Sequence, residues 1–294
     1  MDNSTTGAAS AGTLERKRPA DITDLKQRAE RLRLEVLRLI EIPHLGHYSS
    51  TLSCVEIMTV LYYHTLRLRP REPHWPDRDR FLLGKGHVAV GLWPILADLG
   101  YFSGELLNRF GKLGSPLTDH PDMRRAAGID FSSGSLGHNL SVAVGMGLAA
   151  RLQRRDFRTF VLTGDGELHE GQVWEAAMAA SHYRLGNVIA IVDANGSCGD
   201  GPTSDVMNIE PIAGRFSAFG WNTVEIDGND IPTLIATLDA LPPADSHQPF
   251  CIVARTIKGK GVSFMEEAPR DWHLGYLGPK DRERAVAEIE RRLR

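Results

Sequence analysis

Short apolar runs of β-forming residues alternate with helical stretches along most of this chain, and this alternation constrains the fold more than any other feature. Four runs predict buried strands: Thr159–Thr163, Val188–Val192, Thr223–Ile226 and Phe250–Ala254. The residues around them predict helices at about 141–153, 170–184, 208–219 and 231–241. Strand and helix in regular succession indicate an α/β fold, with a mostly parallel sheet and helices on both of its faces.

The N-terminal part predicts two more helices. Apolar residues recur at helical spacing from Leu25 to Ile40, and a second helix is expected from Cys54 to about Leu66, before a proline-marked loop. Residues 1–20 are small and polar, so we expect a flexible tail there. No internal repeat or obvious linker follows, and residues 21–294 are expected to form a single domain that closes with a charged surface helix.

Composition excludes several classes of protein. A formal net charge of -3 over 294 residues argues against a dedicated nucleic-acid binder, which usually carries a strong basic excess. The three cysteines lie far apart without a CxxC pair, which disfavours a zinc site or a disulfide scaffold and fits a reducing cytoplasm. No apolar run reaches the roughly 18 residues of a membrane span, and the N-terminus lacks a signal-peptide core. We therefore expect a cytoplasmic protein.

Polar side chains follow two of the predicted strands. Asp165 stands between two glycines directly after the first strand, and Asn195 stands at the end of the next, with one predicted helix between them. The carboxyl ends of parallel strands meet at one sheet edge, where ligands of α/β proteins bind. A carboxylate and an amide oxygen, with a loop carbonyl, suit Mg²⁺, whose other ligands are typically phosphate oxygens and water. A lone GDG triplet is ordinary turn chemistry, so the prediction depends on the pair.

The segment GDGELHEGQVWEAAMAASHYRLGNVIAIVDANG (164–196) resembles the thiamine-diphosphate motif of transketolases. Other stretches resemble the same family in the same order: RDRFLLGKGH (78–87), SSGSLGHNLSVAVGMGLA (132–149), DGPT (200–203) and TIKGKGVSFMEEAPRDWH (256–273). The resemblance extends from about residue 25 to about residue 275. It implies a thiamine-diphosphate-binding fold and a transferase activity.

The resemblance also implies roles for individual residues. Asp165, the Asn195 side chain and the Ser197 carbonyl would hold a divalent metal, Mg²⁺ or else Ca²⁺ or Mn²⁺, which in turn would hold the diphosphate of thiamine diphosphate. The implied cofactor-binding residues are His87, Gly134, Ser135, Leu136, Asp165, Gly166, Glu170, Asn195 and His273. Glu175 matches a family glutamate thought to link two active sites, although its position alone favours an ordinary mid-helix glutamate.

Four histidines fall on family positions, namely His47, His87, His120 and His273. The resemblance implies that they are catalytic, since they would orient the carbonyl and hydroxyl groups of the donor and move protons near neutral pH. His47 would also bind substrate, together with Ser50 and Lys258. One loop histidine is usually only solvated, but four on matching motifs favour the functional interpretation.

Three motifs depart from the family pattern. GHYSS (46–50) stands where GHPGG is usual, GHNL (137–140) replaces GQGL, and WHLGY (272–276) replaces WHGKAP. The cofactor motifs are kept while residues expected at the substrate side vary. These departures predict a non-standard substrate.

The chain is about half as long as a full transketolase, and it contains only what resembles the diphosphate-binding domain. The resemblance therefore implies a separate C-terminal subunit with the pyrimidine-binding domain, in an α2β2 heterotetramer. The implied reaction transfers a two-carbon ketol unit from a ketose donor to an aldehyde acceptor. A decarboxylating acyloin-forming enzyme or a 2-oxo-acid enzyme subunit is the alternative, because such enzymes share the GDG and Asn half-site. A non-catalytic paralogue is disfavoured by the presence of Asp165, Asn195 and the four histidines.

Overall fold

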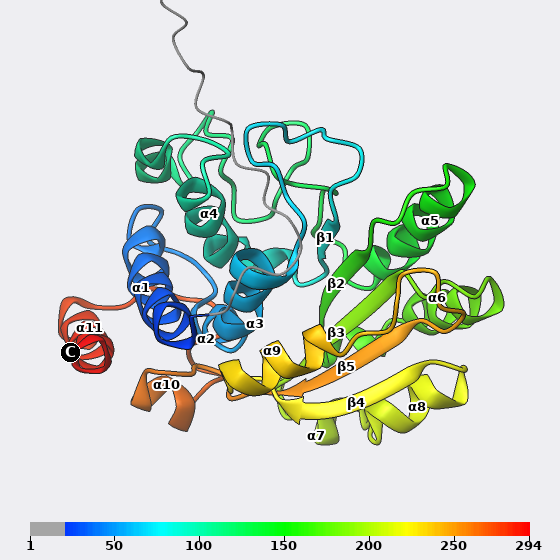
Figure 1. Ribbon diagram of the computed structural model, residues 1–294. Coiled ribbons are helices and arrows are strands. Elements are labelled where there is room, and N and C mark those ends of the chain that lie inside the picture. Colours follow the sequence, from blue (N-terminus) through cyan, green and yellow to red (C-terminus); the bar gives the residue numbers. More distant parts are fainter. Residues whose placement is uncertain (1–20) are drawn as a thin grey trace, which may run out of the picture.

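A computed structural model describes residues 21–294, so the predicted tail at 1–20 lies outside the described residues. The strands are β1 (Arg80–Leu83), β2 (Thr159–Gly164), β3 (Val188–Ala194), β4 (Asn222–Asp227) and β5 (Phe250–Arg255). They form one sheet in the order β1-β2-β3-β5-β4, and every neighbouring pair is parallel (Figure 1). The four predicted strands are confirmed. The sequence prediction missed β1, whose apolar run of Phe81 to Leu83 is short and follows charged residues.

Side chains of the central strands pack against helices on both faces of the sheet. On β3, Ile189 and Ile191 belong to one hydrophobic cluster, while Ala190 and Val192 belong to the other. Successive strand residues point to opposite faces, so a strand covered on both sides is apolar throughout instead of alternating. This burial explains why these strands were recognisable as continuous apolar runs, and it confirms the predicted α/β class with helices on both faces.

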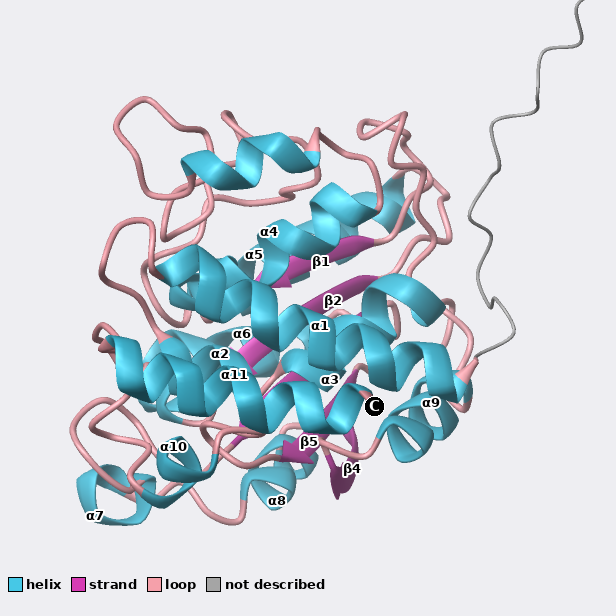
Figure 2. Cartoon of the chain, turned by 90° about the vertical axis from the view of Figure 1, so that its left-hand side faces the viewer, coloured by secondary structure: helices cyan, strands magenta, loops and turns pink. Residues whose placement is uncertain are grey.

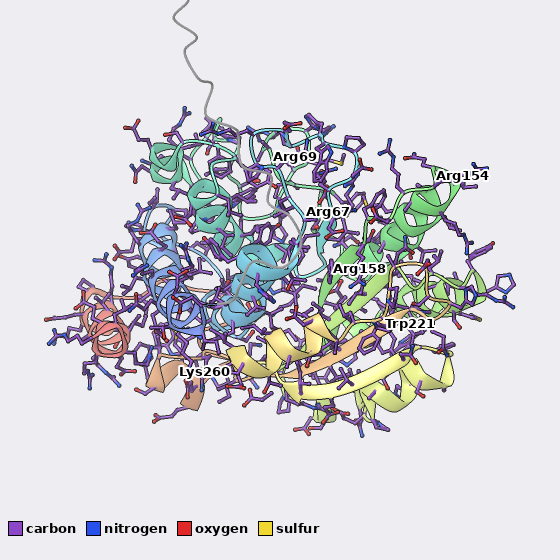
Figure 3. The ribbon with its side chains drawn as sticks, in the orientation of Figure 1. Arg67, Arg69, Arg154, Arg158, Trp221 and Lys260 are labelled. Atoms are coloured by element: carbon purple, nitrogen blue, oxygen red, sulfur yellow. The ribbon has the colours of Figure 1, made fainter. Side chains whose placement is uncertain are left out.

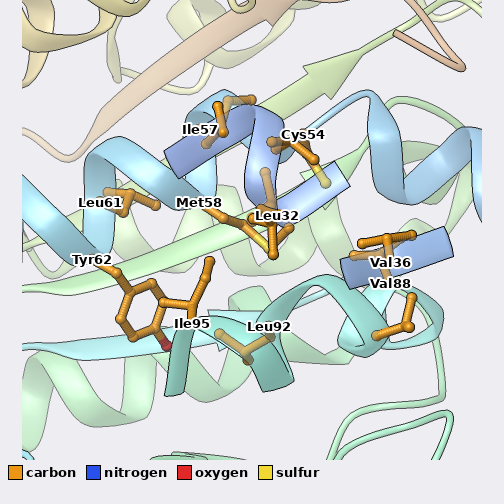
Figure 4. Close-up of a cluster of buried hydrophobic side chains, with 14 of the residues drawn as sticks. Leu32, Val36, Cys54, Ile57, Met58, Leu61, Tyr62, Val88, Leu92 and Ile95 are labelled. Atoms are coloured by element: carbon orange, nitrogen blue, oxygen red, sulfur yellow. The ribbon is translucent and has the colours of Figure 1, made fainter. Parts of the chain in front are cut away.

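The larger cluster packs between the sheet and the helices on one of its faces. Figures 1 and 2 show how these helices lie against the sheet. These helices are α1 (Ile22–Ile40), α2 (Tyr48–Leu52), α3 (Val55–Val60), α4 (Ala89–Asp98), α9 (Ile231–Asp239) and α11 (Pro279–Leu293). Figure 4 shows Leu32 and Val36 of α1 packed among side chains of α3 and α4. Helix α3 continues as a π-helical turn over Leu61–Thr65, which confirms the helix predicted from Cys54 to about Leu66. Helix α4 was not predicted, because its first eight residues are all buried and leave no polar face.

The second cluster packs under α5 (His138–Leu152), α6 (Gly171–His182) and α8 (Ile212–Ala218). Helix α8 begins later than the predicted residue 208. Pro211 occupies its N-cap position, and a proline disfavours helical geometry at the residue before it, here Glu210. Two short helices, α7 (Thr203–Met207) and α10 (Ser263–Glu267), lie in loops that follow β3 and β5. No helix among the described residues has the length and apolar character to cross a membrane.

The parallel arrangement brings the loops after β1, β2, β3 and β5 to one edge of the sheet. Each loop starts with polar or glycine residues directly after a buried strand. This carboxyl edge is therefore where the sequence-predicted residues gather.

Candidate active site

A cavity of about 420 Å³ opens at the carboxyl edge of the sheet. Its walls include residues that follow four strands: His87 after β1, Asp165 after β2, Asn195 after β3 and Lys258 after β5. This volume is within the range of small-molecule and cofactor sites, roughly 300–1,000 Å³. The strand ends thus build one ligand-sized site from segments far apart in the sequence.

The four predicted histidines meet in this cavity. The ring of His47 is central, with centroid distances of 4.8 Å to His87, 5.4 Å to His273 and 6.4 Å to His120. His87 and His273 lie 5.7 Å apart. The four rings come from four separate loops, and the structure brings all of them together.

Two of these rings are neutral at physiological pH. Burial, helped by Lys85 and by the neighbouring histidines, lowers the pKa of His87 well below its usual value. Burial and the Lys258 ammonium lower the pKa of His273 to about 4. A neutral imidazole has one donor and one acceptor nitrogen, so both rings can take part in hydrogen bonding and proton transfer without carrying a charge.

Several buried polar atoms at the cavity lack a hydrogen-bond partner among the described residues. They are Nδ1 of His47, Nδ1 of His273 and Oγ of Ser50. The carboxylate of Asp119 is 3.7 Å from His47 Nδ1, beyond hydrogen-bonding distance. Buried polar groups in folded proteins are nearly always paired, so unpaired atoms in a cavity wall indicate groups that a ligand satisfies.

The predicted metal ligands lie together and supply only oxygen atoms. Asp165 Oδ1 accepts a hydrogen bond from Gly166 N at 2.8 Å, and Oδ2 accepts one from Gly196 N at 2.6 Å. These two bonds fix the carboxylate, whose pKa is raised to about 6 by burial and the nearby Asp193. Asn195 and the Ser197 carbonyl complete the set, and the Lys258 ammonium donates to that carbonyl at 3.1 Å.

This donor set fits a divalent metal that shares its coordination with phosphate. Carboxylate, amide and carbonyl oxygens are the ligands that Mg²⁺ prefers. No group of three or more His, Cys, Asp or Glu among residues 21–294 is arranged to hold a metal ion without further ligands. The Lys258 ammonium donates to the Ser197 carbonyl, and Asp165 and Asp193 favour its charged form, although burial and the nearby Lys85 lower its pKa to about 8.

Backbone packing around the cavity depends on Gly166. A Cβ atom at this position would lie 2.8 Å from the Cβ of Cys198, so a side chain would displace the loop that carries Ser197. Gly134, Leu136 and Glu170, which the resemblance implies as cofactor-binding residues, also line the cavity. Ser135 is exposed and is not among the cavity-lining residues, and Glu175 is exposed on α6 away from the cavity.

Sequence reasoning missed a buried ion pair beneath the cavity. The ammonium of Lys85, after β1, contacts the carboxylate of Asp193 at the end of β3. Ser53 Oγ donates to the same carboxylate at 2.6 Å, and the Thr256 hydroxyl donates to its other oxygen. Lys85 also donates to the Ser50 carbonyl at 2.9 Å. This network joins the ends of β1, β3 and β5, and a carboxylate inside the apolar run IVDA was the available signal for it.

Glu167 is a second buried group that was missed. Its two carboxylate oxygens accept hydrogen bonds from Gly137 N at 2.9 Å and from Gly164 N at 3.1 Å. Burial raises the pKa of this carboxyl to about 7. Glu167 therefore ties the start of α5, and the Gly134–Leu136 loop before it, to the end of β2.

Two of the motif departures meet in the structure. Tyr48 of GHYSS is buried beside the cavity wall instead of lining it, and its hydroxyl accepts a hydrogen bond from Leu277 N at 3.3 Å. A β-bridge joins Gly46 to Gly275, and His44 stacks on Tyr276 with ring centroids 4.6 Å apart. These contacts join the loop that carries His47 to the loop that carries His273. The departures thus set the relative placement of two site histidines.

The Asn139 side chain of the third departure, GHNL, is buried and donates to the Leu83 carbonyl at 3.1 Å. The Asn139 side chain is therefore bonded to the end of β1, and it does not line the cavity.

Residues 25–288 match the family described as transketolase, thiamine diphosphate binding domain. The chain is 37% identical over 272 residues to one subunit of the apulose-4-phosphate transketolase of Phocaeicola vulgatus, covering 92% of this chain and 96% of that protein. It is 39% identical to a 6-deoxy-6-sulfo-D-fructose transketolase subunit of a Clostridium species, covering 91% of this chain and 97% of that one. Human transketolase is 37% identical over 269 residues, which are 90% of this chain but 42% of that protein.

Solved structures agree with these relatives. Transketolase of Campylobacter jejuni superposes with a TM-score of 0.85 at 29% identity, covering 92% of this chain and 43% of that one. Transketolase from Leishmania mexicana superposes with a TM-score of 0.82 at 28% identity, covering 90% of this chain and 41% of that chain. The chain spans less than half of these transketolases and nearly all of the relatives named as subunits. It belongs to the transketolase family of transferases, and it carries that family's thiamine-diphosphate-binding domain.

Proposed function

We propose that this chain is the diphosphate-binding subunit of a two-chain transketolase, which moves a two-carbon ketol unit from a ketose to an aldehyde. The observation that carries this proposal is the group of four histidines around His47, next to the oxygen ligands at the ends of β2 and β3. Two relatives are named for ketoses that bear a phosphate or a sulfo group. We therefore propose that the donor is an anionic ketose.

Thiamine diphosphate, when bound, supplies the nucleophilic carbon that the reaction requires. Asp165, Asn195 and the Ser197 carbonyl would hold Mg²⁺, or else Ca²⁺ or Mn²⁺, and Gly166 would leave its backbone open to the diphosphate. The other residues proposed to bind the cofactor are His87, Gly134, Ser135, Leu136, Glu170 and His273. Among these, Ser135 has the least structural support because it does not line the cavity.

The histidines would orient the substrate and move its protons. His87 and His273 are neutral, so each can donate to one oxygen and accept from another. His47 lies between them with its Nδ1 unpaired, within reach of a hydroxyl or carbonyl oxygen of the donor. Ser50 and Lys258 line the same cavity and would complete the substrate site. His120 is exposed at the edge of the cluster and would act where substrate enters.

A partner chain is part of this proposal. The relatives that match along nearly their full length are named as subunits. We propose a C-terminal subunit with the pyrimidine-binding domain, an α2β2 assembly in the cytoplasm, and residues 21–294 as one domain. Mass measurement of the complex in solution tests the stoichiometry, and any ratio other than two of each chain contradicts it.

The test of the reaction uses the two chains purified together with Mg²⁺ and thiamine diphosphate. The expected result is transfer of a glycolaldehyde unit from a phosphorylated or sulfonated ketose to an aldehyde. Release of carbon dioxide from a 2-oxo acid, without ketol transfer, would instead identify a decarboxylating enzyme. The His47→Asn variant is expected to bind the cofactor and to lose at least about 100-fold in turnover, as for removal of a positioned proton-transfer group.

A further inference from the structure

A second cavity, of about 600 Å³, opens at the opposite edge of the sheet. Three loops form it: residues 153–158 before β2, residues 183–187 before β3 and residues 242–248 before β5. Because these strands are parallel, their amino ends meet here as their carboxyl ends meet at the active-site cavity. Strand length separates the two cavities by roughly 20 Å.

Arginine dominates this second cavity. Its lining contains five arginines and two aspartates: Arg151, Arg154, Arg155, Arg158, Arg184, Asp156 and Asp245. The whole chain, by contrast, carries a net charge of -3. Figure 3 shows Arg154 at the free end of α5 and Arg158 beside the start of β2. The cavity is therefore a local concentration of positive charge on a slightly acidic chain.

Part of that charge is already compensated. Arg155 pairs with Asp77 at 2.5 Å, and Asp156 pairs with Arg67 at 2.7 Å, outside the cavity lining. The guanidinium groups of Arg154 and Arg184 form no hydrogen bond or ion pair with any described residue, and the Arg151 guanidinium donates to the Tyr183 carbonyl at 2.5 Å. Arg158 donates to the Pro242 carbonyl at 2.5 Å. The arginines that remain available to a ligand are thus Arg151, Arg154 and Arg184.

Arg154 and Arg184 occupy equivalent positions at the ends of two packed helices. After α5, Arg155 N bonds to Ala150 O at 2.9 Å, and after α6, Leu185 N bonds to Ala180 O at 3.0 Å. Both ends are Schellman motifs, in which the residue with positive φ is usually glycine. Here that residue is Arg154, with φ 55°, and Arg184, with φ 52°. A non-glycine residue in this conformation costs about 1 kcal/mol, so two arginines stand where glycine would be favoured for the fold.

A neutral donor also lies in the cavity wall. Ser246 Oγ is buried and has no hydrogen-bond partner among the described residues. Its loop packs so closely on Gly186 that a Cβ added there would clash with that oxygen. Leu185, Pro243 and Ala244 give the cavity an apolar side. A hydroxyl without a partner, guanidinium groups without counter-ions and an apolar wall together form a complementary surface for a small organic anion.

We propose that this cavity is a second binding site, separate from the active site, for a small anion that carries a phosphate group. Guanidinium groups bind phosphate oxygens in pairs of parallel hydrogen bonds, so arginine suits a phosphate better than a simple point charge does. The volume accommodates a phosphorylated metabolite of the size of a sugar phosphate. The helix dipole also favours cations at helix C-termini, which is another reason for arginines at these positions. That effect does not explain why a cavity and an unpaired Ser246 hydroxyl lie beside them.

The test is calorimetric titration of pyrophosphate into the full chain without divalent metal. We expect saturable binding that Arg154→Ala/Arg184→Ala weakens at least about tenfold, because two charge-assisted contacts are lost. The matched control, Arg71→Ala/Arg109→Ala, removes the same charge from two exposed positions elsewhere and should bind like the wild type. Lys258→Met removes a cation from the active-site cavity and should also leave this binding unchanged.

Three outcomes would overturn the proposal: no saturable binding, equal affinities for the wild type and the Arg154/Arg184 variant, or loss of binding only in Lys258→Met. A variant that melts earlier yet binds pyrophosphate normally would show that the arginines serve only to end the helices. Inorganic phosphate and a pentose 5-phosphate are then compared. Tighter binding of the pentose phosphate supports an organic phosphate ligand, whereas equal affinities support free phosphate at the same site.

Discussion

The two ends of the sheet hold polar side chains in opposite ways. At the carboxyl end, Asp165, Asp193 and Lys85 are buried, and each has a partner directly beneath the cavity. At the amino end, Arg154 and Arg184 are exposed, and their guanidinium groups have no partner among the described residues. Both ends belong to the same parallel strands, so strand geometry alone does not decide which end carries which chemistry.

Burial changes the chemistry of the polar groups at the carboxyl end. At the carboxyl end, desolvation raises the pKa of Asp165 and Glu167 and lowers that of His87 and His273. The protonation states of these four groups therefore respond to a bound cation or to a proton transfer. At the amino end, water screens the arginines, which remain charged and can only attract an anion. Substitutions at both ends of the sheet test this contrast.

Asp165→Ala removes the only charged ligand of the proposed metal and should have the largest effect. We expect metal-dependent affinity for thiamine diphosphate to fall at least about 100-fold, because the diphosphate is held through the metal. Calorimetry with the cofactor, Mg²⁺ and the partner chain measures it. Asp156→Ala, a carboxylate change at the amino end, is the control and should bind normally. Unchanged affinity in Asp165→Ala would refute the metal assignment.

Lys85→Met leaves the Asp193 carboxylate buried without its counter-ion. Breaking a buried ion pair on one side costs about 3–5 kcal/mol of the free energy of unfolding, which urea denaturation measures. Adding Asp193→Asn should recover part of the loss. Arg155→Met breaks the more exposed pair with Asp77 at the amino end and should cost less than about 1 kcal/mol. Similar losses for Lys85→Met and Arg155→Met would remove the contrast between the two ends.

His273→Gln tests the effect of burial through pH. The folded pKa of about 4 lies below the usual 6.5, so only the unfolded chain gains this proton as the pH falls through that window. Acid therefore destabilises the wild type at this site, while glutamine does not titrate. From pH 7 to pH 4.5 the variant should lose less stability than the wild type, by up to about 2 kcal/mol.

Thermal or urea unfolding at several pH values measures this difference in stability. If the stabilities of His273→Gln and the wild type change in parallel with pH, the prediction is wrong. Turnover of the assembled enzyme should fall at least about 100-fold in the same variant. His247→Gln, at an exposed position of the amino end, is the matched control and should follow the wild type in both measurements.

Tyr48→Phe should have the smallest effect. It removes the acceptor for Leu277 N and costs about 1 kcal/mol in unfolding free energy, with a raised KM for the donor because the His47 and His273 loops lose one link. Tyr63→Phe removes an exposed hydrogen bond to Asp98 and should cost less, with no change in KM. A KM that stays constant in Tyr48→Phe would show that the two loops hold their positions without this bond.

The sequence was sufficient for the parts of the fold that depend on local pattern. Strands β2, β3 and β5 were predicted because parallel strands buried on both faces are continuous apolar runs. The edge strand β4, which has no buried residue, was predicted from the β-forming residues Thr223 to Ile226. The four histidines and the Asp165–Asn195 pair were predicted from motifs, and the structure places them at one cavity. Strand β1 was missed because four residues give too short a pattern for the period to be recognised.

Other features depend on pairing between distant segments, which no local pattern contains. Lys85 and Asp193 are 108 positions apart, and only the strand order brings them together. The sequence interpretation placed Tyr48 at the substrate side, whereas the structure turns its side chain into the core toward Leu277. The arginines around residue 154 were not singled out, because their convergence with Arg184 and the 242–248 loop follows from the topology of the sheet.

The complete burial of β2 and β3 has a consequence for motions of the molecule. Every residue of both strands is buried, and each strand is hydrogen-bonded on both sides. Their amide hydrogens should exchange with deuterium only when the whole domain opens, so they should be among the slowest-exchanging amides of the chain. Exchange at the loops that carry Asp165 and Arg184 should be much faster, so ligand protection at either loop can be measured against an internal reference in the same chain.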